Sequence, residues 1–182
     1  MFFTRRGDDG FTDLLGGQRL AKESMRITAL GDIDEATSAI GLGRALAQRD
    51  DTRAALLHVQ KDLYLLMADL ATVEGKMAGQ QRLADEAVQQ LEEIIAGFDT
   101  RVSIPREFVA PGDSVAGAAL DVARTVVRRA ERTITHLCHD GDGANRTMMT
   151  YLNRLSSLLF GLARYEDTAQ GATPTISKTI QG

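Results

Sequence analysis

Apolar residues recur at helical spacing along most of the chain. From Leu120 to Leu137, and again from Met148 to Leu162, they follow one another at intervals of three and four residues. This spacing places them on one side of a helix, as in members of a helix bundle. Earlier stretches separated by charged or glycine-containing breaks predict three further helices, at Ser24–Gln48, Asp51–Thr72 and Arg82–Phe98.

The breaks between these stretches set the expected boundaries. Pro105 and the PGD sequence at Pro111–Asp113 predict a nonhelical link before the fourth helix, and Gly141–Gly143 predicts the turn before the fifth. We therefore expect an all-α fold, with a five-helix bundle over residues 24–170 and a C-terminal tail over residues 171–182.

The first 23 residues have a different character from the bundle. The sequence FFTRRGDDGFTDLLGG at Phe2–Gly17 is too rich in glycine for a stable helix and too polar for a core strand. A frayed terminus is one interpretation. The other is a loop with a binding role, and it depends on what the rest of the chain does.

Composition narrows the class of protein. The 182 residues, 43% of them hydrophobic, suit one globular domain, and the net charge of -4 disfavours a nucleic-acid partner. No apolar stretch is long enough to span a membrane, and the MFF start lacks the features of a signal peptide. Cys138 is the single cysteine and agrees with a reducing compartment. We expect a cytoplasmic protein without a membrane partner.

Arginines gather on one side of the predicted fourth helix. Arg124, Arg128, Glu131 and Arg132 stand at offsets of 0, 4, 7 and 8, which places them in one stripe beside the apolar seam. A solvated face with an Arg128 to Glu131 pair is the ordinary interpretation. However, like charges four residues apart repel one another, so three arginines with one acid predict an external anion or carboxylate.

A carboxylate on the first helix is a candidate for that partner. Leu30, Asp34, Thr37 and Gly41 follow a 4, 3, 4 spacing, which predicts that they face inward and that Asp34 is partly buried. A buried carboxylate needs a cation, which an arginine of the fourth helix could supply from this or a neighbouring subunit. Alternatively, Asp34 interacts with the helix dipole in the first turn.

The common catalytic patterns are absent from the sequence. His136, Cys138 and His139 lack a fourth ligand and the spacing of a closed zinc site, so we interpret them as incidental. The Glu-x-x-His pairs of di-iron bundles, the phosphate-binding glycine motifs and the nucleophile elbow do not occur either. An enzyme built from this sequence has no obvious general base.

Six segments, in order, closely resemble the PduO-type ATP:cob(I)alamin adenosyltransferases: TRRGDDGFT at Thr4–Thr12, RLAK ending at Lys22, ALGDIDE at Ala29–Glu35, FVAPGD at Phe108–Asp113, ARTVVRRAER at Ala123–Arg132 and YLNRLSSLLFGLAR at Tyr151–Arg164. The resemblance implies a five-helix bundle that assembles as a homotrimer, with active sites between adjacent subunits. The chain departs from the family pattern at Asp113, where a second glycine is common, and also at Glu35–Thr37 and at Ser157.

The resemblance also implies a reaction that needs no protein base. Cobalamin reduced to Co(I) attacks the 5′-carbon of ATP, triphosphate leaves, and adenosylcobalamin forms. The protein supplies position and positive charge, with Mg²⁺ held through the ATP phosphates. A corrinoid reductase and an adenosylcobalamin-dependent enzyme are possible partners. A non-catalytic corrinoid carrier, a nucleotide-responsive binding protein or a purely structural trimer on the same bundle are the alternatives.

Matching the motifs position by position gives the implied site. Arg128 and Phe108 are the implied catalytic residues, with Phe108 lying against the corrin and keeping a lower axial ligand off the cobalt; taken alone, Phe108 would be assigned to the core. Arg124 is implied to pair with Asp34 across the subunit interface. The N-terminal segment is expected to close over ATP. The implied ATP-binding residues are Thr4, Arg5, Gly7, Asp8, Gly10, Thr12, Lys22, Arg128, Glu131, Arg132 and Asn153.

Overall fold

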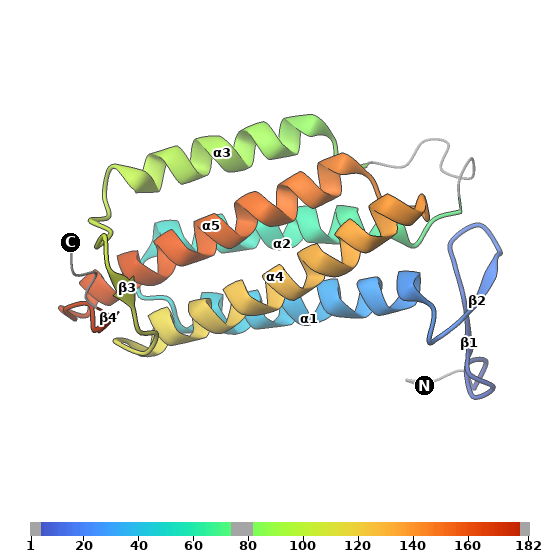
Figure 1. The fold of residues 1–182 in the computed structure, drawn as a ribbon, viewed down its shortest axis with the longest axis horizontal. Helices are drawn as coiled ribbons and strands as arrows, with labels where there is room; N and C mark the ends of the chain where they lie inside the picture. The colour runs from blue at the N-terminus through green and yellow to red at the C-terminus, as the bar shows by residue number, and fades with distance from the viewer. Residues whose placement is uncertain (1–4, 74–81, 179–182) are drawn as a thin grey trace.

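Five helices pack side by side as an elongated bundle in the computed structural model (Figure 1), which describes residues 5–73 and 82–178. The five helices expected from the apolar spacing are confirmed, although the third begins at Asp85 and not at Arg82. In the described residues the helices are α1 (Met25–Leu46), α2 (Asp50–Leu70), α3 (Asp85–Asp99), α4 (Val115–Asp140) and α5 (Arg146–Ala169).

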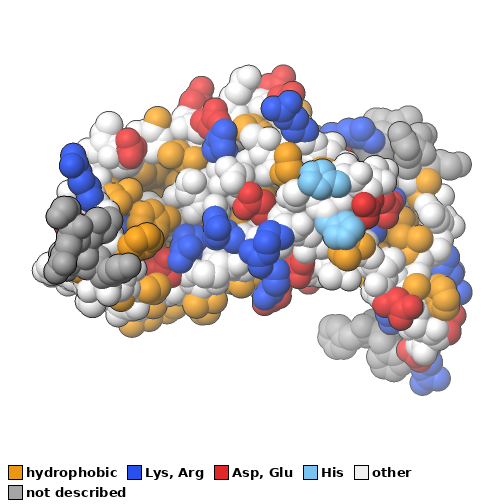
Figure 2. Space-filling model, in the orientation of Figure 1, with side chains coloured by type: hydrophobic (Ala, Val, Ile, Leu, Met, Phe, Trp, Pro, Cys, Tyr) orange, Lys and Arg blue, Asp and Glu red, His pale blue; other side chains and the backbone are white. Residues whose placement is uncertain are grey.

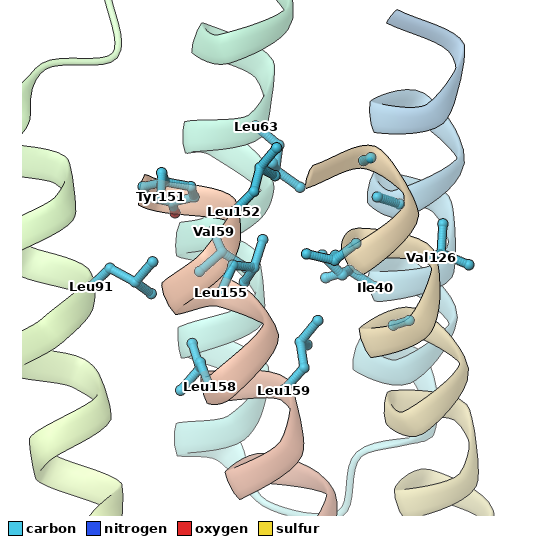
Figure 3. Close-up of a cluster of buried hydrophobic side chains, with 14 of the residues drawn as sticks. Ile40, Val59, Leu63, Leu91, Val126, Tyr151, Leu152, Leu155, Leu158 and Leu159 are labelled. Atoms are coloured by element: carbon cyan, nitrogen blue, oxygen red, sulfur yellow. The ribbon is translucent and has the colours of Figure 1, made fainter. Parts of the chain in front are cut away.

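The fifth helix lies at the centre of the core. α5 contacts α4 and α3 extensively and also reaches α2, while α1 packs against α4 and α2. Figure 3 shows Leu152, Leu155 and Leu159 of α5 directed into the cluster between these helices, and all three are fully buried. The 4, 3, 4 spacing therefore identified the buried side of α5 correctly.

Polar side chains cap the N-terminal ends of α4 and α5, the two longest helices. The Ser114 side chain accepts a hydrogen bond from the backbone N–H of Gly117 and caps α4, and Asn145 accepts one from Met148 and caps α5. Gly141 ends α4 with φ of 71°, a left-handed conformation that glycine adopts without strain. These are the breaks that the PGD and glycine-rich segments predicted.

The inward side of α1 differs from the prediction. The buried residues include Ala29, Ile33, Ala36 and Ile40, whereas Asp34 is exposed within the chain. The prediction that Asp34 is partly buried is therefore wrong for the single chain. Because each helical residue turns about 100° from the one before it, the side chain after Ile33 points away from the core.

Two short antiparallel ribbons add to the bundle where the sequence indicated a loop and a tail. β1 (Phe11–Asp13) pairs with β2 (Arg19–Ala21), and β3 (Phe108–Val109) pairs with β4 (Ile176–Lys178). The sequence predicted a loop segment over residues 1–23 and a tail over residues 171–182, and it did not predict these strands. Strands of two or three residues are too short to show alternation in sequence, so backbone pairing alone defines them.

The first ribbon is attached to the end of α2. The Leu15 N–H donates to the Ala71 carbonyl at 2.8 Å, and Val73 N–H donates to the Leu15 carbonyl at 2.9 Å, while the neighbouring Leu14 is buried. Figure 1 shows this ribbon at one end of the bundle and β3 with β4 at the other. No described helix is long and apolar enough to cross a membrane.

We expect Leu155→Ala to lower the free energy of unfolding by about 2–5 kcal/mol, because truncation leaves a cavity in the closely packed core. Urea denaturation at fixed protein concentration measures the change. Leu57→Ala is the matched control, since Leu57 is 40% exposed, and it should cost less than about 1 kcal/mol. Equal losses in the two variants would show that α5 does not form the centre of the core.

Candidate functional site

A row of basic side chains crosses the face formed by α4 and α5 (Figure 2). Arg124 and Arg128, one helical turn apart on α4, line a cavity of about 370 Å³. The cavity lies between α4, α5 and the end of α3, where Ile95 and Phe98 supply apolar walls. The site thus combines positive charge with an apolar pocket.

Arg128 differs from Arg124 in lacking a counter-charge in the described part of the chain. Its side chain is exposed and has no hydrogen-bond or ion-pair partner among the described residues. The alternative pair with Glu131 does not form in the chain, because the Glu131 carboxylate instead accepts a hydrogen bond from the Asn153 amide at 2.8 Å. Arg132 donates to the Arg128 backbone carbonyl at 3.0 Å. The structure therefore brings together four residues of the predicted ATP site.

A buried charge network holds Arg124. Asp121, 3% exposed, accepts hydrogen bonds from Arg124 Nε at 2.9 Å and from Arg164 Nη2 of α5 at 2.8 Å. Arg164 Nε lies 2.8 Å from Asp167 Oδ2 as an ion pair without hydrogen-bond alignment. Asp167 in turn accepts a hydrogen bond from the Ser114 hydroxyl at 2.6 Å.

This network reaches the beginning of α4 through a close approach at Gly117. A Cβ at that position would lie 2.1 Å from Asp167 Oδ1, so only glycine leaves room for the carboxylate. The network balances two arginines with two aspartates inside the bundle. Sequence reasoning missed it: the spacing of three between Asp121 and Arg124 was a readable signal, but the pairing between α4 and α5 was not.

Arg129 serves a different purpose from its neighbours. It pairs with Asp32 of α1 at 3.4 Å and also with Glu35, and the Glu35 carboxylate raises the pKa of Arg129. Asp34 lies between these acids in sequence but has no ionic partner in the described part of the chain, so its predicted pair with Arg124 does not form within one chain.

The N-terminal loop is organised around Lys22. Lys22 Nζ donates to the Gly7 carbonyl at 2.6 Å, and its backbone N–H donates to the Gly10 carbonyl at 2.9 Å. A Cβ at Gly7 would lie 2.9 Å from Lys22 Nζ, so the flexible end of the lysine side chain would have to shift. Arg5 adopts φ of 63°, an uncommon left-handed conformation that recurs at ligand-binding loops.

The remaining predicted residues of this loop are placed as follows. Asp8 and Gly10 are exposed at the turn, and Thr12 is half-buried on β1. Thr4 lies outside the described residues. Arg5, Gly7, Asp8 and Gly10 thus lie in one loop, and Lys22, directly after β2, is hydrogen-bonded to it.

Phe108 lies far from this loop, on β3 at the opposite end of the bundle (Figure 1). Its side chain is 67% exposed, which excludes core packing within the chain. The predicted site residues therefore form three groups in one chain: the N-terminal loop, the α4 and α5 face, and Phe108. In the described residues no group of three or more His, Cys, Asp or Glu side chains is suited to hold a metal ion.

Comparison with known proteins identifies the family of this chain. The family described as cobalamin adenosyltransferase matches residues 2–166, and this chain belongs to it. A cobalamin adenosyltransferase of Cupriavidus metallidurans is 41% identical over 176 residues, covering 95% of this chain and 91% of the relative. A corrinoid adenosyltransferase of Citrobacter freundii is 39% identical, covering 91% and 94% respectively.

Solved structures show the same fold. A phenylalanine-to-alanine variant of a PduO-type ATP:corrinoid adenosyltransferase from Lactobacillus reuteri, complexed with cobalamin and ATP, superposes with a TM-score of 0.87. It is 30% identical, and the comparison covers 98% of this chain and 100% of that one. An arginine-to-lysine variant of the Lactobacillus reuteri enzyme, complexed with ATP, gives a TM-score of 0.85 at 31% identity.

We expect Asp121→Asn to lower the free energy of unfolding by about 3 kcal/mol, because it leaves two arginines facing one buried carboxylate. Urea denaturation measures the loss. Asp140→Asn is the matched control, because Asp140 is exposed and pairs only with His136, and it should change stability by less than about 0.5 kcal/mol. A loss at Asp121 no larger than at Asp140 would contradict a structural role for the network.

Proposed function

We propose that this chain transfers the 5′-deoxyadenosyl group of ATP to cob(I)alamin and releases triphosphate. The observation that carries the proposal is Arg128, an exposed cation with no counter-charge among the described residues. It lies beside the hydrogen-bonded Glu131 and Asn153, in a chain of the cobalamin adenosyltransferase family. An exposed arginine without a counter-charge is suited to bind an anionic group of the substrate.

The chemistry requires alignment and charge stabilisation, not proton transfer. The Co(I) centre is the nucleophile and forms the cobalt–carbon bond, while the bond from the 5′-carbon to the triphosphate oxygen breaks and that oxygen takes the electron pair. Charge develops on the leaving triphosphate, so Arg128 and Arg132 act as cations that stabilise it more strongly in the transition state. Glu131 and Asn153 are the polar groups available to position the nucleoside.

The N-terminal loop is the proposed second part of the ATP site. Lys22 and Arg5 supply positive charge, and Gly7 and Gly10 allow the backbone to approach the phosphates. We propose that the loop closes over ATP and separates it from water. Mg²⁺ would be held mainly through the ATP phosphates, as is usual for this ion in nucleotide sites.

Phe108 is the proposed contact to the corrin. Its exposed ring presents an apolar surface that would lie under the macrocycle and exclude a lower axial ligand. Removing that ligand makes Co(II) easier to reduce, so the ring promotes formation of the nucleophile without taking part in bond formation.

We propose that the complete site forms between adjacent subunits of a homotrimer. Within one chain, the N-terminal ribbon and Phe108 lie at opposite ends of the bundle (Figure 1), so one chain does not surround both substrates. Asp34 is exposed, and Arg124 contacts Asp121 only through Nε. The other guanidinium nitrogens of Arg124 could therefore bind Asp34 of an adjacent subunit.

We expect Arg128→Ala to reduce kcat by about 100- to 1,000-fold, the effect of removing a group that stabilises developing charge. The assay mixes the protein with ATP, Mg²⁺ and chemically reduced cobalamin and follows the absorbance of adenosylcobalamin. Lys61→Ala, on the exposed surface of α2, is the control for losing one cation and should retain activity. Corrinoid binding without turnover in the unaltered protein would favour the carrier alternative and overturn the enzyme proposal.

We expect mixed assembly of two inactive variants to restore turnover. If Lys22 and Arg128 of each site come from different chains, random mixing of Lys22→Ala and Arg128→Ala subunits leaves about one quarter of the sites intact. Subunits are mixed by mild denaturation and refolding, and light scattering checks the assembly. Activity no higher than the sum of the separate variants would show that one chain supplies both residues.

A further inference from the structure

The C-terminal segment is joined to the strand that carries Phe108. β3 and β4 pair antiparallel, with Val109 opposite Ile176, and the pairing is irregular between Phe108 and Val109. The Ala110 N–H donates to the Thr175 carbonyl at 2.7 Å, and the Ser177 hydroxyl donates to the Phe108 carbonyl at 2.9 Å. Phe108 is thus held through its backbone while its ring remains exposed.

Asp113 closes this ribbon with a double contact to Thr175. Its Oδ2 accepts the Thr175 N–H at 3.0 Å, and its Oδ1 accepts the Thr175 hydroxyl at 2.6 Å. These hydrogen bonds lower the pKa of Asp113, so the carboxylate is ionised at neutral pH. Asp113 also immediately precedes Ser114, which caps α4 and contacts the buried Asp167.

The ribbon is a poor candidate for a stabilising core element. Thr175, Ile176 and Ser177 are all exposed, as is Phe108, so the pairing buries little apolar surface. A two-stranded ribbon is marginally stable on its own and needs additional contacts to persist. The hydrogen bonds between Asp113 and Thr175 supply these additional contacts, and they fix the position of β4 against β3.

We propose that Asp113 and Thr175 are positioning residues that make the C-terminal strand part of the corrinoid site by holding Phe108 in place. This inference rests on the proposed function, in which Phe108 contacts the corrin. It also gives a use to Asp113, where the chain departs from the glycine common in the family. Glycine at this position would provide neither contact to Thr175.

The first test measures the ribbon without any substrate. Thr175→Val keeps the shape of the side chain but removes the hydroxyl donor, and Asp113→Ala removes both contacts. We expect the Ala110 amide to exchange with deuterium about 3- to 10-fold faster in Thr175→Val, and faster still in Asp113→Ala. Thr173→Val is the matched control, since Thr173 is exposed and without a hydrogen-bond partner in the described chain. Unchanged exchange in both variants would overturn the proposal.

The second test measures binding and does not require turnover. Visible absorbance gives the affinity for cob(II)alamin in the presence of ATP, and calorimetry gives the affinity for ATP alone. We expect Thr175→Val to bind cob(II)alamin about 3- to 10-fold more weakly with ATP affinity unchanged, whereas Thr173→Val leaves both constants unchanged. Faster exchange with unchanged cob(II)alamin affinity, or equal loss of both affinities, would overturn the link to the corrinoid. Failure of turnover in the unaltered protein would overturn the proposed reaction, while binding still decides the role of Thr175.

Discussion

The face of α4 and α5 that carries Arg128 depends on the buried carboxylate of Asp121. This carboxylate is shared by Arg124 on its own helix and Arg164 on α5, so it fixes the rotation of α4 against the central helix. A carboxylate in this position needs both cations, since burying it alone would cost several kcal/mol. Because α4 is fixed in this way, Arg128, one turn after Arg124, is presented at the cavity.

The separation of the predicted site residues follows from the elongated bundle. The N-terminal loop lies beside the end of α2, and Phe108 lies before the beginning of α4. These are opposite ends of the bundle, so the two stay apart in one chain (Figure 1). A reaction that transfers the deoxyadenosyl group of ATP to a large corrinoid needs contacts on both substrates. The proposed assembly of several chains would bring the two groups together, and the exposed Asp34 and Arg128 are residues that such an assembly could use.

Periodicity predicted the helices because long apolar seams at spacings of three and four leave little alternative, as in α5. Periodicity failed on α1, where Asp34 shares a helical spacing with Leu30 and Thr37. The neighbouring series through Ile33 and Ile40 has larger apolar side chains, and it is this series that is buried. The motif match grouped Glu131 with Asn153, and the structure places them in hydrogen-bond contact. The contact of Asp113 with Thr175 joins segments 62 residues apart, which one sequence does not reveal.

A crystal structure of this protein with ATP tests the shared site most directly. We predict that the triphosphate contacts Arg128 of one subunit and the Lys22 loop of the next, with Glu131 and Asn153 beside the nucleoside. ATP bound entirely within one chain, or bound away from Arg128, would contradict the site proposed between subunits.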